Sequence, residues 1–196
     1  FSQGMCYSFE SPKAFDKLLI PADSELRKAI TISNPLGEDY SIMRTLPLNG
    51  MLTSLSTNYN RRNKDVRLYE LGNVYLPKSL PLTELPEERM QFTLGFYGEG
   101  DFFAMKGVVE EFLEHVGMKQ KPIYDPADKK PFLHPGRQAD VIYQGERVAY
   151  LGEVHPKVAE NYGIGTRVYV AVIDMPKIVS MATFDRKYEG IAKYPA

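Results

Sequence analysis

Apolar side chains recur along this chain at two spacings, one typical of helices and one typical of strands. Between Leu48 and Tyr59 the large apolar residues stand at i, i+3, i+4, i+7 and i+11, on one face of a helix of about three to four turns. A second run, from Met105 to Val116, repeats this spacing and ends at Gly117, a residue common just past a helix end. The pattern predicts two amphipathic helices.

Segments rich in β-branched and aromatic residues surround these helices and predict strands. They cover residues 28–32, 66–75, 91–97, 139–143, 147–154 and 167–173. Short helices are expected at 11–19, 156–162 and 174–181, and loops at 76–88 and 122–135. Gly72 predicts a bulge or a close approach within its strand. Because turns rather than helical crossovers join many of the strands, we expect an α+β fold, with a mostly antiparallel sheet flanked by helices.

Composition narrows the class of protein. With 43% hydrophobic residues, the 196 positions allow one sizeable core, so we expect a single domain over residues 1–196. The 24 Lys and Arg residues nearly balance the 25 Asp and Glu residues, so any RNA contact must be local. No apolar run approaches the roughly 20 residues that span a bilayer. We expect a cytoplasmic protein without a membrane partner.

Two further features bear on the cellular setting. Cys6 is the one cysteine, which excludes an internal disulfide, and we expect it to be a small buried apolar residue rather than a reactive thiol. The ends of the sequence, Phe1 and Tyr194-Pro195-Ala196, indicate a segment of a longer polypeptide.

No local pattern marks a catalytic, cofactor or metal site. His134 and His155 each precede a proline and lack the spacing of a zinc site, so we expect structural roles in turns. The glycines of residues 95–100 match neither a dinucleotide fingerprint nor a P-loop, and no GxSxG elbow occurs. We therefore expect no catalytic, cofactor-binding or metal-binding residue.

Two carboxylates within predicted strands need cationic partners if they are buried. They are Glu70 and Glu153, and Arg67 or Arg137 could serve either one. The sequence leaves the pairing open.

Longer stretches carry a resemblance. They are SNPLGEDYSIMRTLPLNGMLTSLSTNYNRR, VRLYELGNVYLP, FTLGFYGEGDFFAMKGVVEEFLEHVG and FLHPGRQADVIYQGERVAYLGEVHPKVAENYGI. In this order and spacing, they resemble the beta chain of bacterial phenylalanyl-tRNA synthetase, in its region related to class II synthetase catalytic domains. The resemblance covers most of the chain and implies a class II aminoacyl-tRNA synthetase-like fold within a longer beta chain.

The family resemblance also implies a function. Phenylalanyl-tRNA synthetase is a heterotetramer of two alpha and two beta chains that uses ATP and magnesium to attach phenylalanine to its tRNA, and the alpha chain performs the reaction. The region resembled here has lost the reaction and packs against alpha. We therefore expect a non-catalytic scaffold domain. Two alternatives stay open, namely a regulatory class II synthetase paralogue that senses an amino acid and an active adenylate-forming enzyme.

The sequence departs from the active class II pattern at both ATP-binding elements. Active enzymes hold the triphosphate with an arginine in a strand-loop-strand and with another arginine in a helix after a glycine-rich strand. Here the strand carrying Arg67 continues without an Arg-x-Glu pattern, and residues 168–173 carry Val and Ala in place of glycines. Pro176-Lys177-Ile178 replaces the arginine helix. We expect no cofactor in this domain, although the resemblance implies that the holoenzyme uses ATP and magnesium.

The helix at residues 48–62 corresponds to one that contributes to subunit contacts in class II synthetases. Its apolar stripe is expected to face the core, so its flanks are the candidates for contact with alpha. The candidate interface residues are Ser54, Thr57, Asn58 and Arg61. Arg62 is the candidate contact with tRNA phosphate. Editing of mischarged tRNA belongs to other parts of the full beta chain.

Overall fold

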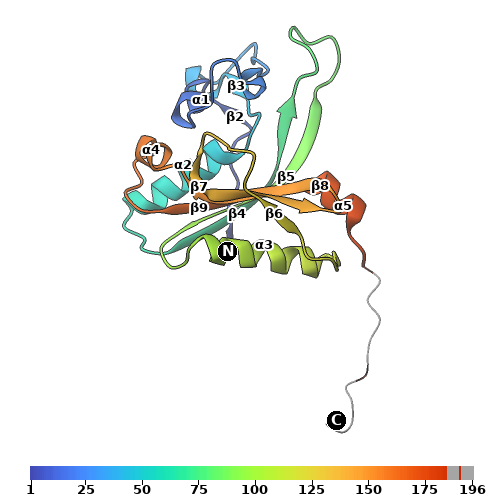
Figure 1. Cartoon of the computed structure of the whole chain (residues 1–196). Helices are drawn as coiled ribbons and strands as arrows, with labels where there is room; N and C mark the ends of the chain where they lie inside the picture. Colours follow the sequence, from blue (N-terminus) through green and yellow to red (C-terminus); the bar gives the residue numbers. More distant parts are fainter. Residues whose placement is uncertain (185–189, 191–196) are drawn as a thin grey trace.

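One large sheet organises the described part of the chain, residues 1–184 and Gly190, in this computed structural model (Figure 1). Within these residues the sheet has seven strands in the order β1-β4-β5-β9-β8-β7-β6. The strands are β1 Ser2–Gln3, β4 Val66–Leu76, β5 Glu87–Tyr97, β6 Ile123–Asp125, β7 Leu133–Tyr143, β8 Glu146–Val154 and β9 Val168–Asp174. All neighbours run antiparallel except β1, which is parallel to β4. A small second sheet pairs β2 (Phe9–Glu10) with β3 (Ile42–Met43).

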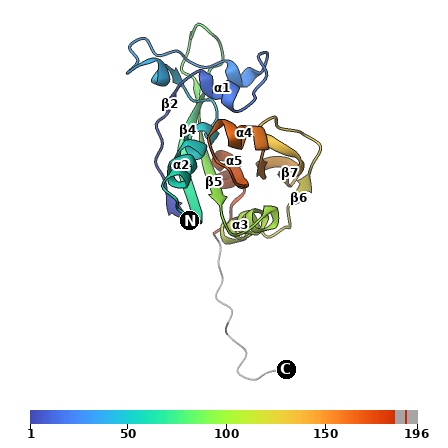
Figure 2. The same ribbon diagram turned by 90° about the vertical axis from the view of Figure 1, so that its left-hand side faces the viewer.

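Helices cover both faces of the large sheet, as Figures 1 and 2 show. They are α1 Lys13–Lys17, α2 Leu48–Asn60, α3 Phe102–His115, α4 Pro156–Asn161 and α5 Met175–Met181. Two 3-10 helices, Glu25–Arg27 and Glu38–Tyr40, lie in the N-terminal region. α2 packs on one face, and α3 and α5 pack on the other. The prediction of an α+β fold with a mostly antiparallel sheet is confirmed.

Strand β9 belongs to two cores at once. Val168, Val170 and Val172 pack in the core under α2, whereas Ala171 and Ile173 pack in the core under α3. Both faces of β9 are therefore buried, which explains why its sequence is a continuous apolar run.

The predicted apolar stripe of α2 is confirmed. Leu48, Met51, Leu52 and Leu55 are buried, and Tyr59 is half-buried at the end of the helix. A side chain at Gly95 of β5 would come within 2.8 Å of the Met51 Cγ atom. The helix thus lies directly on the sheet.

Two predictions of local structure are wrong. Residues 28–32 do not form a strand, since only Thr31 makes a bridge, to Ile42, after the 3-10 helix. Residues 122–135 are not all loop, because β6 and the start of β7 lie within them. Pro135 fits in β7 where its pairing with β8 is interrupted between Leu133 and Gln138, a position that tolerates proline.

The segment Tyr194-Pro195-Ala196 lies outside the described residues. Across the part of the chain that the structure does describe, no helix combines the length and apolar character needed to cross a membrane.

Candidate functional site

Arg67 and Lys177, which the sequence pattern singled out, lie on β4 and on α5 after β9. The Arg67 guanidinium on β4 donates to the Glu99 carbonyl oxygen at 2.9 Å and lies 5.4 Å from the centre of the Phe96 ring. Lys177 on α5 donates to the Arg147 carbonyl oxygen at 3.0 Å and pairs with Glu146 at 3.5 Å. Both cations are thus engaged by the protein itself.

A small hollow lies where β5, β8 and β9 meet the start of α5. Its volume is about 100 Å³, and Gln91, Tyr150, Val172 and Asp174 are among the residues that line it. Pockets for small molecules and cofactors typically measure roughly 300–1,000 Å³. This hollow is therefore too small for a nucleotide.

A buried ion pair ties the segment before α2 to β4. Arg44 Nη1 donates to Glu70 Oε1 at 3.0 Å, and Arg44 Nε donates to the Asn73 carbonyl oxygen at 2.8 Å. A side chain at Gly72 would collide with the Arg44 guanidinium, which confirms the predicted close approach. The expectation that Arg67 or Arg137 neutralises Glu70 is wrong, because Arg44 reaches it from the neighbouring segment.

The candidate interface residues at α2 differ in their exposure and in their hydrogen bonds. Thr57, Arg61 and Arg62 are exposed. Ser54 Oγ lies 3.6 Å from Cys6 Sγ. Asn58 is engaged locally, since its Nδ2 donates to the Ser54 carbonyl oxygen at 3.0 Å and its Oδ1 accepts from the Asn63 side chain at 2.8 Å.

The N-terminal segment lies along the outer side of α2. A side chain at Gly50 would approach the Cys6 Cβ atom to 2.7 Å, so Cys6 faces the helix. Cys6 is half-buried rather than fully buried, and burial raises the pKa of its thiol. Its neighbours Met5 and Tyr7 are 90% and 70% exposed. Large apolar side chains at positions 5, 7 and 9 alternate with smaller side chains at positions 6 and 8. This alternation is the sequence signal that could have identified the exposed apolar side chains of the N-terminal segment.

A buried carboxylate joins the N-terminal region to α2 and α4, and no sequence pattern indicated it. Asn49 Nδ2 donates to Glu10 Oε2 at 3.0 Å, and the Tyr162 hydroxyl donates to Asn49 Oδ1 at 2.7 Å. The other oxygen of Glu10 is buried without a hydrogen bond. Burial raises the pKa of Glu10 to about 7.

The predicted turn role is confirmed for His155, whereas His134 lies within β7 rather than in a turn. His155 Nδ1 accepts from the Lys157 amide at 3.1 Å and caps α4, and His134 Nδ1 accepts from the Gly136 amide at 3.1 Å. Within the described residues, no group of three or more His, Cys, Asp or Glu side chains could hold a metal ion.

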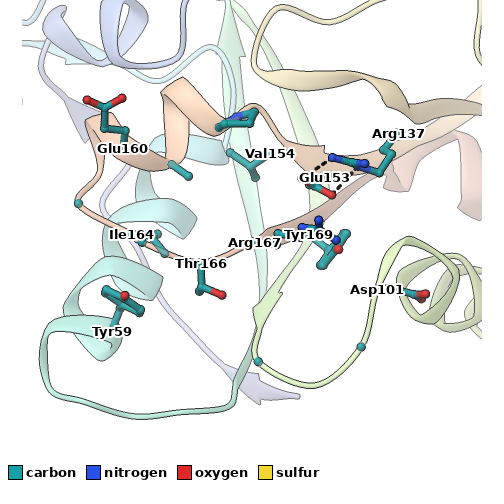
Figure 3. Close-up of a pocket in the computed structure, with 16 residues that line it drawn as sticks. Tyr59, Asp101, Arg137, Glu153, Val154, Glu160, Ile164, Thr166, Arg167 and Tyr169 are labelled. Carbon is teal, nitrogen blue, oxygen red and sulfur yellow. Dashed lines mark hydrogen bonds and ion pairs between the residues drawn. The ribbon is translucent and has the colours of Figure 1, made fainter.

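A large cleft lies at one end of the sheet, where α2, α4 and the β5–α3 turn meet (Figure 3). Its volume is about 1060 Å³. Arg137 and Glu153 are turned toward each other in it, with Nε–Oε2 and Nη2–Oε1 distances of 2.7 and 3.2 Å. Burial and then the nearby Glu153 raise the pKa of Tyr169 in the same cleft. Arg137 is thus the partner of Glu153, one of the two options that the sequence left open.

Comparisons with known proteins agree with the fold. The family model of the phenylalanyl tRNA synthetase beta chain CLM domain matches residues 1–175. The chain is 43% identical over 195 residues to the phenylalanine–tRNA ligase beta subunit of Clostridium tetani, and 44% identical over 194 residues to that of Clostridium acetobutylicum. The matches cover 100% and 99% of this chain but 24% of each relative, so the chain spans about a quarter of their length.

A solved structure extends the comparison to the fold. The crystal structure of pyrrolysyl-tRNA synthetase from Desulfitobacterium hafniense matches with a TM-score of 0.71 and 15% identity, over 91% of this chain and 62% of that one. This likeness confirms the class II aminoacyl-tRNA synthetase-like fold. Together with the family model, it identifies the chain as a member of the family of phenylalanyl-tRNA synthetase beta chain CLM domains.

Proposed function

We propose that this chain is a non-catalytic scaffold domain of a phenylalanine–tRNA ligase beta subunit. In this role residues 1–196 form one catalytic-like domain of a longer beta chain in the cytoplasm. The domain packs against the alpha subunit, which uses ATP and magnesium to attach phenylalanine to its tRNA. The names of the relatives in the two Clostridium species support the assignment to this ligase.

The observation that carries the proposal is the closed sheet face under α2. Val168, Val170 and Val172 are buried there, and Met51 lies against Gly95. A nucleotide needs open space and countercharge at such a face. Here side chains of the chain's own helix take that space.

The engaged cations support the same conclusion. Arg67 and Lys177, which stand in the two elements that bind triphosphate in active class II enzymes, are both bound by neighbouring groups. Freeing either one for a ligand would require breaking these contacts. ATP and magnesium are therefore assigned to the holoenzyme and not to this domain.

The surface that we assign to the alpha subunit combines the flank of α2 with the N-terminal segment. Exposed apolar side chains mark candidate protein contacts, and Met5 and Tyr7 are exposed on either side of Cys6, whose sulfur lies 3.6 Å from Ser54 Oγ. Thr57, Asn58 and Arg61 extend the surface along α2. Polar groups at the rim of an apolar centre are the usual arrangement at protein interfaces.

Co-expression with the alpha subunit, followed by size-exclusion chromatography, tests the proposal. The wild-type chain is expected to elute with alpha, and Met5→Asp is expected to weaken binding at least about tenfold, or about 1.4 kcal/mol. Ile123→Asp is the matched control, because Ile123 is also exposed but lies on β6 at the other end of the sheet. Separate elution of the wild-type chain from alpha contradicts the proposal.

A second measurement separates the scaffold from its alternatives. Calorimetric titration of the chain with ATP is expected to give no saturable binding. Saturable binding of ATP together with phenylalanine would favour an active adenylate-forming enzyme. Binding of phenylalanine alone would favour a regulatory paralogue.

A further inference from the structure

The large cleft of Figure 3 has two unlike walls. One wall is apolar and comes from the ends of α2 and β8 and from α4, where the exposed Pro156, the half-buried Tyr59 and the buried Val154 line it. The other carries charge and comes from β7, β9 and the start of α3, with Arg137, Arg167 and Asp101. A ligand that fits both walls must combine an apolar group with charged groups.

Arg137 is fixed in place by a carboxylate that solvent barely reaches. The Glu153 side chain is 4% exposed, whereas that of Arg137 is 41% exposed. Glu153 holds the Nε and Nη2 atoms of Arg137, so the remaining Nη1 edge is available to a ligand. A preorganised guanidinium of this kind suits a carboxylate, which it can bind with little loss of side-chain entropy.

A second arginine borders the same cleft. Arg167 is exposed and directly precedes β9. It makes no ion pair with any residue that the structure describes. Arg137 and Arg167 together therefore offer donors for one anionic group.

The acidic residues of the cleft decide which anion fits. Asp101 and Glu160 line it together with the two arginines. Glu160 pairs with Lys157 at 3.1 Å. Asp101, in contrast, makes no ion pair with any described residue and caps α3 by accepting from the Ala104 amide at 3.0 Å. A polyanion such as an RNA backbone would meet these carboxylates, and like charges at close range oppose binding. A ligand with one carboxylate and a cationic group at some distance meets complementary charge at both places.

We propose that this cleft binds the C-terminal end of a partner polypeptide. The terminal carboxylate lies on Arg137 and Arg167, the last side chain is apolar and packs against Pro156 and Tyr59, and a basic side chain upstream faces Asp101. Capture of a terminal carboxylate is a recurrent mode of peptide recognition. The volume of about 1060 Å³ gives room for several residues, which favours a peptide end over a free amino acid.

A short peptide and its amidated twin test the proposal on the 196-residue chain. The probes are acetyl-Lys-Ala-Leu with a free carboxylate and the same peptide with a C-terminal amide, titrated by calorimetry. The free acid is expected to saturate, and the amide to bind at least about tenfold more weakly, because it lacks the charge that the arginines recognise.

Variants assign the binding to the cleft. Arg167→Gln is expected to weaken binding of the acid at least about tenfold and to leave the melting temperature unchanged, since Arg167 is exposed. Arg147→Gln is the matched control, an exposed arginine on β8 outside the cleft, and is expected to bind as the wild type. The double variant Arg137→Gln/Glu153→Gln replaces this ion pair by neutral amides and is expected to weaken binding as well.

Several results would overturn the proposal. These are equal binding of acid and amide, no saturable binding of the acid at millimolar concentration, and unchanged binding by Arg167→Gln. Free leucine binding as tightly as the peptide would show a small-molecule site instead. The inference does not depend on contact with the alpha subunit, because the probe is a peptide and the readout uses this chain alone.

Discussion

The raised pKa of Glu10 predicts how the stability of the chain depends on pH. Its side chain is buried, one oxygen accepts from Asn49 and the other has no hydrogen bond. Burial disfavours the charged carboxylate and is the main cause of a pKa raised from 4.5 to about 7, while Asn49 and Arg44 oppose the rise. Replacing Glu10 with glutamine keeps the shape and removes the titration.

The sign and size of the effect of Glu10 on stability at each pH follow from the linkage between proton binding and folding. The folded chain binds this proton more tightly than the unfolded chain, so the contribution of Glu10 to stability falls as pH rises from about 4.5 to about 7 and stays low above. A shift of about 2.5 units corresponds to about 3 kcal/mol, at 1.36 kcal/mol for each unit. Glu10→Gln is therefore expected to be more stable than the wild type at pH 8 and close to it at pH 4.5.

Urea denaturation followed by circular dichroism at several pH values measures this difference. The free energy of unfolding of Glu10→Gln minus that of the wild type is expected to rise by about 3 kcal/mol across this range. Glu111→Gln, a variant of an exposed carboxylate on α3, is measured beside it as the control. A difference between Glu10→Gln and the wild type that does not change with pH would refute the reasoning.

Three further predictions concern packing, charge and RNA. Gly95→Val is expected to lower the free energy of unfolding by about 1–3 kcal/mol in urea denaturation, because the new side chain meets Met51. Gly107→Ala is the control and is expected to be tolerated, because the space around Gly107 is open. Equal effects of the two variants would contradict the tight packing under α2. Arg44→Met is expected to lower the free energy of unfolding by about 3–5 kcal/mol in the same assay, because it leaves the Glu70 carboxylate buried without its partner. The double variant Arg44→Met/Glu70→Leu is expected to recover part of that stability. No recovery would contradict this account. Arg62→Ala is tested in the assembled ligase by filter binding of phenylalanine tRNA at several salt concentrations. The slope of the logarithm of affinity against the logarithm of salt concentration is expected to fall in magnitude by about 1. An unchanged slope would exclude a phosphate contact of Arg62.

Local patterns were sufficient for the elements that lie under the large cores. α2 and α3 each bury one stripe, and β9 is buried on both faces, so the period of their apolar residues is set by burial alone. The two-residue strands β1, β2 and β3 contain too few residues for any period. They form because distant segments offer hydrogen bonds, which a local pattern does not contain.

The candidate sites were harder to predict for the same reason. The partner of Glu70 is Arg44, 26 positions away, and only the fold brings the two together. The cleft takes its lining from α2, the β5–α3 turn, β7, β8, α4 and β9, and no one of these segments carries a recognisable motif. Glu153 could be identified as a carboxylate in need of a partner, but the choice of Arg137 required the register of β7 and β8.

The closed face under α2 depends on the side chains that β9 places there. A glycine-rich β9 would leave space above the sheet but would contribute little apolar surface to the core. Val168, Val170 and Val172 fill that space, and burying such side chains stabilises a fold by about 1.5–3 kcal/mol each. Once α2 rests on these valines and on Gly95, reopening the face would cost this burial. The proposed scaffold role is therefore favoured by the same packing that stabilises the domain, and opening this face to a ligand would require substitutions in β9 and in α2 together.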